Sequence, residues 1–175
     1  MPMMLCFLAA FGLFIHGASP TVSFEDSGEM VSVAYTLGVT HPPGYPWLTM
    51  LGRLFQFLPL GDPAFRMNTL SAAAGAGAVS LVFALTALLV TRLPRLSAST
   101  VRLAPWIGAA SFALSKTLWW QAGIAEKYTM SAMLMLLALH ALLRHALEPR
   151  PGRLAAAVFL SALALSHHLH GLYLI

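Results

Sequence analysis

Charged side chains are scarce in this chain. Asp, Glu, Lys and Arg make up 9% of its 175 residues, whereas hydrophobic residues make up 58%. A typical soluble domain carries about 25% charged residues, so the composition excludes an ordinary water-soluble fold. We therefore expect an integral membrane protein surrounded by membrane lipid, with no nucleic-acid partner.

Cysteine is also rare. The single Cys6 lies inside the first apolar run and has no second cysteine with which to form an intrachain disulfide. In such surroundings a thiol packs as a small hydrophobic side chain. The cysteine content therefore leaves the redox compartment undetermined.

Long apolar runs are what the chain does have. A helix that crosses a bilayer needs about 20 apolar residues, and the charges divide the chain into five candidate segments. These are approximately residues 2–18, 67–91, 103–115, 128–143 and 154–175. We therefore expect an all-α membrane protein, a multi-pass helical bundle with about five spans that forms a single transmembrane domain over residues 1–175.

The few charges are unevenly distributed along the chain. Residues 91–102 carry three arginines and no acid, and residues 144–153 carry three arginines against the single Glu148. By the positive-inside rule both loops face the cytoplasm. The opposite side then receives five of the six acids, which are Glu25, Asp26, Glu29, Asp62 and Glu126. We expect a cell membrane, such as a bacterial inner membrane, with the acidic side facing the periplasm or exterior.

The first outer loop, residues 19–66, is too apolar for an ordinary solvated loop. Residues 45–60 are expected to form a helix with a narrow polar stripe, and such a helix should lie in the plane of the membrane interface. The stripe consists of Thr49, Arg53 and Gln56. Asp62 is expected to cap the next helix, with Pro63 at its first position.

A short polar island in this loop joins Asp26-Ser27-Gly28-Glu29 to His41-Pro42-Pro43-Gly44. Asp26 and Glu29 have the spacing of an N-terminal capping box, which would explain both acids structurally. The double proline is typical of a rigid turn. Polar groups beside a bilayer also favour a functional role, so both interpretations stay open.

Several short strings, taken together, resemble the protein O-mannosyltransferase-like membrane family of the GT-C glycosyltransferase superfamily. The strings are residues 24–29 (FEDSGE), 37–46 (LGVTHPPGYP), 59–62 (PLGD), 66–68 (RMN), 125–129 (AEKYT) and 165–169 (LSHHL). The resemblance implies a multi-spanning bundle whose first outer loop holds the catalytic acid. It also implies a sugar donor carried on a polyprenyl phosphate, with mannose as the sugar of the best-known relatives, and a hydroxyl acceptor such as protein Ser or Thr.

Transfer of a sugar from a lipid phosphate needs a base near the hydroxyl and donors near the phosphate. Asp26 is our candidate catalytic base, with Glu29 orienting it. The candidate substrate-binding residues are His41, Arg53, Arg66, Glu126, Lys127 and His168. The structural alternatives are that Arg53 extends to the lipid headgroups and that Glu126 and Lys127 form a weak surface pair.

The three histidines 167, 168 and 170 lack the further ligands that a metal site requires, so we expect them to line the donor cavity rather than hold a metal. No cofactor is expected, and a need for a divalent metal is left undecided. A transporter or a non-catalytic scaffold is the alternative function, although acids gathered in a loop disfavour transport. The chain ends inside an apolar run, and we expect it to be the N-terminal part of a longer GT-C-like domain.

Overall fold

A computed structural model describes residues 1–174, and within this range every regular element is helical. The elements are α1 (Pro2–His16), α2 (Ser27–Thr36), α3 (Pro46–Phe55), α4 (Pro63–Val90), α5 (Ala98–Ala113), α6 (Lys116–Ala122), α7 (Tyr128–Leu147), α8 (Pro151–His167) and the 3-10 helix η1 (Leu169–Leu174). The all-α prediction is therefore confirmed for the described part of the chain.

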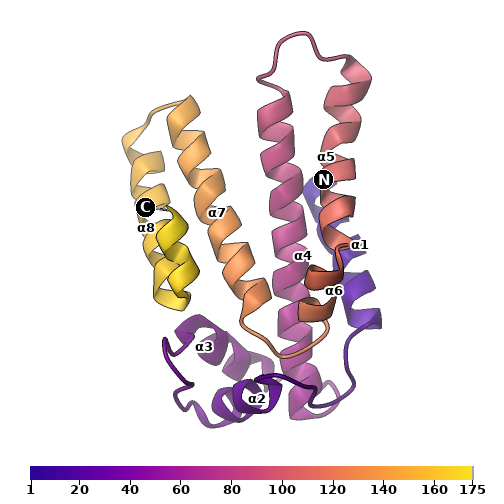
Figure 1. Cartoon of the computed structure of the whole chain (residues 1–175), viewed down its shortest axis with the longest axis vertical. Helices are drawn as coiled ribbons and strands as arrows, with labels where there is room; N and C mark the ends of the chain where they lie inside the picture. The colour runs from indigo at the N-terminus through magenta and orange to yellow at the C-terminus, as the bar shows by residue number, and fades with distance from the viewer. Residues whose placement is uncertain (175) are drawn as a thin grey trace.

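The longer helices run side by side, and α2 and α3 lie together across one end of them (Figure 1). The α4–α5 and α7–α8 loops meet at the other end, where Arg92 contacts Glu148 at 3.1 Å. The two arginine-rich loops thus share one end of the bundle, as the charge pattern predicted. The five remaining acids lie in or beside α2, α3 and the α6–α7 loop at the opposite end.

Two helices, α4 and α7, are long and apolar enough to cross a membrane. The expected set of about five spans is not confirmed, because α1, α5 and α8 have only 15, 16 and 17 residues. At about 1.5 Å per residue such helices cover roughly 22 to 26 Å, less than the ~30 Å of a bilayer core. All three are too short, and of the three only α1 is apolar enough by composition.

Helix α4 is the centre of the packing and contributes to two hydrophobic clusters. Met67 and Leu70 belong to a cluster shared with α2, α3 and α7, whereas Ala72 and Ala76 belong to one shared with α1, α5 and α6. The small side chains of α4 allow this close approach: a Cβ added at Gly75 would lie 3.1 Å from the Cβ of Ala122 and 3.2 Å from the ring of Phe14. The position of α4 fixes where the loops at its start can lie.

The start of α4 follows the predicted pattern. Asp62 accepts a hydrogen bond from the backbone N–H of Phe65 at 2.8 Å, and Pro63 is the first helical residue. The preceding helix α3 ends at Phe55, five residues earlier than predicted. Within its polar stripe Thr49 and Gln56 are buried, and the Gln56 amide donates to the carbonyl of Pro63 at 3.1 Å. That contact ties α3 to the beginning of α4.

Candidate functional site

The segment between α1 and α2 is held in place by backbone contacts to two other parts of the chain. The N–H of Ser19 donates to the carbonyl of Gly123 at 2.8 Å, and the buried Asn68 amide donates to the carbonyl of Ser19 at 2.7 Å. The Thr21 hydroxyl donates to Asp62 at 2.8 Å. Together these contacts bring Asp26, the residue just before α2, next to the α6–α7 loop.

Asp26 is not used as a helix cap. It occupies the position before α2, but its carboxylate accepts no backbone hydrogen bond there. Instead Lys127 donates to its Oδ2, and the N–H of Asp26 donates to Oε1 of Glu126 at 2.8 Å. In a capping box Glu29 would accept that N–H. The capping-box interpretation is therefore wrong, and the acid is free for another purpose.

Glu126 and Lys127 are buried with their charges paired. Glu126 is 0% and Lys127 4% exposed, and Lys127 Nζ lies 3.0 Å from Glu126 Oε2. Burial alone would lower the pKa of Lys127, but hydrogen bonds to Asp26 and Glu126 outweigh it and raise that pKa. The hydrogen bond from Lys127 lowers the pKa of Asp26. Lys127 is therefore protonated and Asp26 ionised at neutral pH, and the buried Glu126–Lys127 pair is not the weak surface pair considered above.

Glu29 and His41 form a second pair beside the first. The two carboxylate oxygens of Glu29 accept from the backbone N–H and from Nδ1 of His41, each at 2.7 Å. The hydrogen bond from His41 lowers the pKa of Glu29. The other ring nitrogen, Nε2, lies 3.1 Å from the Tyr45 hydroxyl and 3.9 Å from Asp26 Oδ2. The histidine thus stands between the two acids.

The double proline forms the turn that the sequence predicted. The N–H of Gly44 donates to the carbonyl of His41 at 3.0 Å, and Gly44 has a φ of +100°, which favours glycine. This turn directs His41 back toward the start of α2. The rigid-turn interpretation of the motif and a role in the site are therefore compatible.

Aromatic rings enclose the other side of Lys127. Its Nζ lies 4.8 Å from the ring centre of Tyr128 and 5.7 Å from that of Tyr45, within cation–π range. His168 stacks on Tyr45 at a centroid distance of 5.6 Å, and Nε2 of the buried His167 lies 3.4 Å from the Lys127 carbonyl. The end of α8 therefore reaches the same site.

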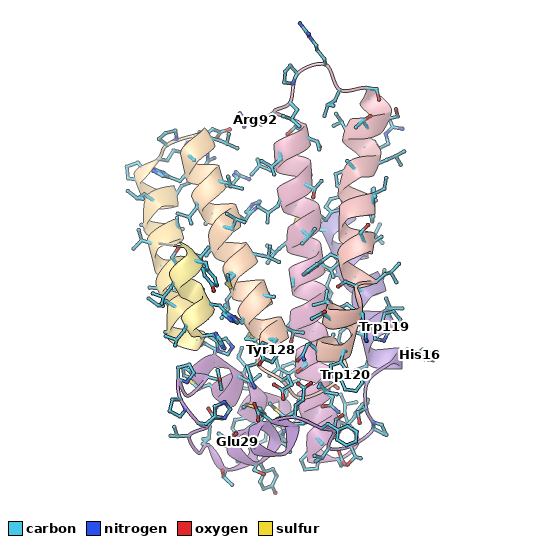
Figure 2. The ribbon with its side chains drawn as sticks, in the orientation of Figure 1. His16, Glu29, Arg92, Trp119, Trp120 and Tyr128 are labelled. Carbon is cyan, nitrogen blue, oxygen red and sulfur yellow. The ribbon has the colours of Figure 1, made fainter. Side chains whose placement is uncertain are left out.

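The structure brings together five of the predicted site residues, which are Asp26, Glu29, His41, Glu126 and Lys127. His168 joins this group by stacking on Tyr45. In Figure 2, Glu29 and Tyr128 lie at the same end of the bundle, opposite to Arg92. Side chains of Asp26, Glu29 and His41 remain 36% to 43% exposed. The site is thus open to solvent on the acid and histidine side and closed on the lysine side.

Two predicted substrate-binding cations are not brought to this group. Arg53 donates to the carbonyl of Tyr35 at 2.7 Å and lies over the ring of Phe57. Arg66 donates to three backbone carbonyls of the segment between α3 and α4, at 2.8 to 3.2 Å. Both guanidinium groups therefore act in holding the α2–α3–α4 region together, and neither extends toward Asp26.

Three supporting residues were not among the predicted site residues. Tyr45 contacts His41 and Lys127, Asn68 holds the segment before α2, and the hydroxyl of Ser71 lies 3.4 Å from the N–H of Glu126. Asn68 and Ser71 are polar residues near the start of the apolar helix α4, and such isolated polar positions were a signal that could have identified them.

Comparison with known proteins shows which family the chain matches. Residues 26–175 match the family model described as "Protein O-mannosyl-transferase TMEM260 N-terminal domain". A Mus musculus protein named "Protein O-mannosyl-transferase TMEM260" is 49% identical over 59 residues, which are 33% of this chain. A Dictyostelium discoideum protein named "Protein O-mannosyl-transferase tmem260" is 39% identical over 69 residues, which are 39% of this chain.

The chain spans only 8% of the length of each of these two relatives. No solved structure matches it. The family model, in contrast, covers the chain from the candidate acid Asp26 to its last residue. Because that match includes most of the chain, the protein belongs to the family of protein O-mannosyl-transferase TMEM260 N-terminal domains.

Proposed function

We propose that this region forms part of the active site of a GT-C-type membrane glycosyltransferase. The enzyme would move a sugar, mannose in the first instance, from a polyprenyl-phosphate donor to a Ser or Thr hydroxyl of a protein acceptor. One observation carries the proposal: a solvent-accessible Asp26 is held by a buried Lys127–Glu126 pair at the acidic end of an apolar bundle. The printed names of the two relatives support the class of reaction.

The reaction requires one bond to form and one to break. The acceptor hydroxyl attacks the anomeric carbon, the bond from that carbon to the phosphate oxygen breaks, and the phosphate leaves with the electron pair. Asp26 accepts the hydroxyl proton. The hydrogen bond from Lys127 lowers the pKa of Asp26, so the carboxylate is ionised at neutral pH and can accept a proton. Its side chain is 43% exposed, so an acceptor can reach it.

Glu126 and Lys127 are positioning residues in this proposal. Their burial keeps them from direct contact with a substrate, and their hydrogen bonds fix both the backbone N–H and the carboxylate of Asp26. Glu29 orients His41, which faces the open side together with Tyr45 and is the better candidate for contact with acceptor or phosphate. A fixed base in an open site is the geometry that transfer to a hydroxyl needs.

The membrane setting belongs to the same proposal. The apolar α4 and α7 would cross a cell membrane, such as a bacterial inner membrane, in a bundle of about five spans completed by the shorter helices. The arginine-rich loops would lie in the cytoplasm, so the site would face the periplasm or exterior. A lipid-linked donor would then present its phosphate at the membrane surface, beside α2 and α3.

The test uses the full-length protein in detergent, with polyprenyl-phosphate mannose as donor and a Ser/Thr-rich polypeptide as acceptor. Asp26→Asn keeps the shape of the side chain but removes the base, and we expect transfer to fall by about 100-fold or more. Glu25→Gln, in the adjacent acid that accepts from Trp120 and Gln121, is the matched control and should transfer as the wild type does.

Equal transfer by the Asp26→Asn and wild-type proteins would move the base to another residue. If folded wild-type protein transferred none of several polyprenyl-linked sugars, the enzyme proposal would be wrong, and the scaffold and transporter alternatives would take its place. Circular dichroism and gel filtration in detergent establish that the compared proteins are equally folded.

A further inference from the structure

The exposed part of the site has the composition of a metal centre. Asp26, Glu29 and His41 each offer one ligand atom, and these atoms lie within 4.8 Å of one another. Oxygen ligands with one imidazole suit a divalent ion of the Mg²⁺ and Mn²⁺ class. Nε2 of His41 and Oδ2 of Asp26 are 3.9 Å apart. Two ligands about 2.1 Å from one ion are separated by roughly 3.0 to 4.2 Å, so both can reach the same ion.

Glu29 holds the His41 ring in an orientation that suits metal binding. Its Oε2 accepts from Nδ1 at 2.7 Å and its Oε1 accepts the backbone N–H, which fixes the ring and places the proton on Nδ1. Nε2 then carries the lone pair, on the side of Asp26. A carboxylate that accepts the second N–H of a histidine is the usual partner of a metal-bound imidazole.

The net negative charge of the site favours the binding of a cation. Asp26, Glu29 and Glu126 bring three negative charges, and Lys127 brings one positive charge, which leaves two negative charges when His41 is neutral. Among residues 1–174, Arg53 and Arg66 donate to backbone carbonyls elsewhere. A site with this charge would repel the phosphate of an anionic donor, whereas a bound divalent ion would neutralise it.

We propose that Asp26 and Nε2 of His41 bind one divalent cation of the Mn²⁺ or Mg²⁺ class, with Glu29 fixing the His41 ring and with water and a phosphate oxygen of the donor in the remaining positions. The phosphate part of this inference rests on the proposed glycosyltransferase function. Such ions are commonly held by one or two carboxylates together with substrate phosphates. The exposure of all three side chains leaves room for those further ligands.

Two neighbouring groups must adjust to the ion. The Tyr45 hydroxyl, 3.1 Å from Nε2, must turn its hydrogen away from the ring. Lys127 donates to Oδ2 of Asp26, the same atom that lies 3.9 Å from Nε2, so the Asp26 carboxylate must turn to offer Oδ1 to the ion while Oδ2 keeps the ammonium. Each of these changes involves an exposed or rotatable group.

The test is a titration of the purified, chelator-treated full-length protein in detergent with Mn²⁺, in which the electron paramagnetic resonance signal of free Mn²⁺ reports binding. We expect one Mn²⁺ per chain. Asp26→Asn and Glu29→Gln should each weaken binding by at least 10-fold. Tyr45→Phe, which removes only the competing hydroxyl, should bind Mn²⁺ as tightly as the wild type or more tightly.

Glu25→Gln is the control for non-specific attraction, because it removes one negative charge next to Asp26 but no ligand, and it should leave Mn²⁺ affinity unchanged. The proposal is overturned if the folded wild type binds no stoichiometric Mn²⁺, or if Asp26→Asn and Glu29→Gln bind it as the wild type does. The titration needs no sugar. If the protein binds Mn²⁺ but transfers no sugar, the result counts against the proposed enzyme and not against the metal site. If metal-free protein transfers sugar, the result counts against the metal and not against the enzyme.

Discussion

Lys127 donates a hydrogen bond to Asp26, which lies 101 positions earlier in the chain, and pairs at 3.0 Å with the fully buried Glu126. One ammonium group therefore forms ion pairs with two carboxylates, one of them solvent-accessible and the other fully buried. Charge pairs of this kind are costly to break, because the partner left behind is buried and uncompensated.

Replacing Lys127 by Met should therefore destabilise the protein strongly. Glu126 would remain buried without its partner, and we expect the free energy of unfolding to fall by about 3 kcal/mol or more. Thermal unfolding in detergent, followed by circular dichroism, measures the change. Adding Glu126→Gln to Lys127→Met should restore part of the loss, since the buried group is then neutral. A Lys127→Met protein that melts with the wild type would show that this pair contributes nothing to the fold.

Gly52 marks a close contact of α3 with α2 and α4. A Cβ at this position would lie 2.6 Å from Sδ of Met67 and 2.8 Å from the Cβ of Ala34. Gly52→Ala should therefore cost about 1 to 3 kcal/mol through overpacking, visible as a lower melting temperature. The matched control is Gly12→Ala in α1, where nothing lies within 4 Å and the gain in helix propensity is about 0.5 to 1 kcal/mol. Equal melting temperatures for the two variants would contradict the tight α2–α3–α4 contact.

The cap on α4 should make stability depend on pH in the acid range. The N–H of Phe65 and the hydroxyl of Thr21 donate to Asp62 and lower its pKa below the ordinary 3.8. The folded state then binds this proton less tightly than the unfolded state, so the ionised group contributes stability above pH 3.8 that is lost as the pH falls below it.

Asp62→Asn tests this linkage, because the amide keeps an acceptor oxygen for the cap but cannot titrate. We expect the wild type to melt at a higher temperature at pH 7 and the difference to shrink below about pH 4. Melting curves at a series of pH values in one detergent give the comparison. A difference that stays constant from neutral pH down to about pH 3 would mean that Asp62 has no shifted pKa.

Signals that act over a few residues were interpreted correctly from the sequence. Asp62 and Pro63 begin α4 as predicted, and the opposite placement of the arginine-rich loops and the five acids follows from where charges interrupt the apolar runs. The expected set of about five spans is not confirmed, because in the described part of the chain only α4 and α7 are long and apolar enough to cross a bilayer. The first and fifth predicted segments extended to residues 18 and 175, whereas α1 ends at His16 and α8 at His167.

Roles that depend on distant partners could not be predicted. Asp26 and Glu29 have the capping-box spacing whether or not the box forms. The box does not form because Glu126, 100 positions later in the chain, accepts the N–H of Asp26. Arg53 and Arg66 had the charge expected of phosphate ligands, but in the folded chain they donate to backbone carbonyls of the α2–α3–α4 region. In each case the sequence identified the residue, but it did not identify the partner that the residue contacts in the folded chain.

The sequence by itself determined that this protein is apolar and helical, where α4 begins, and that its acids gather at one end of the bundle. Only the tertiary structure decided that Asp26 belongs to Lys127 and Glu126 rather than to the start of its own helix. The physical reason is the distance along the chain over which each interaction acts. Hydropathy and helix capping act between neighbours in the chain, whereas a pair of charges separated by 101 positions meets only after packing around α4 has brought the two loops together.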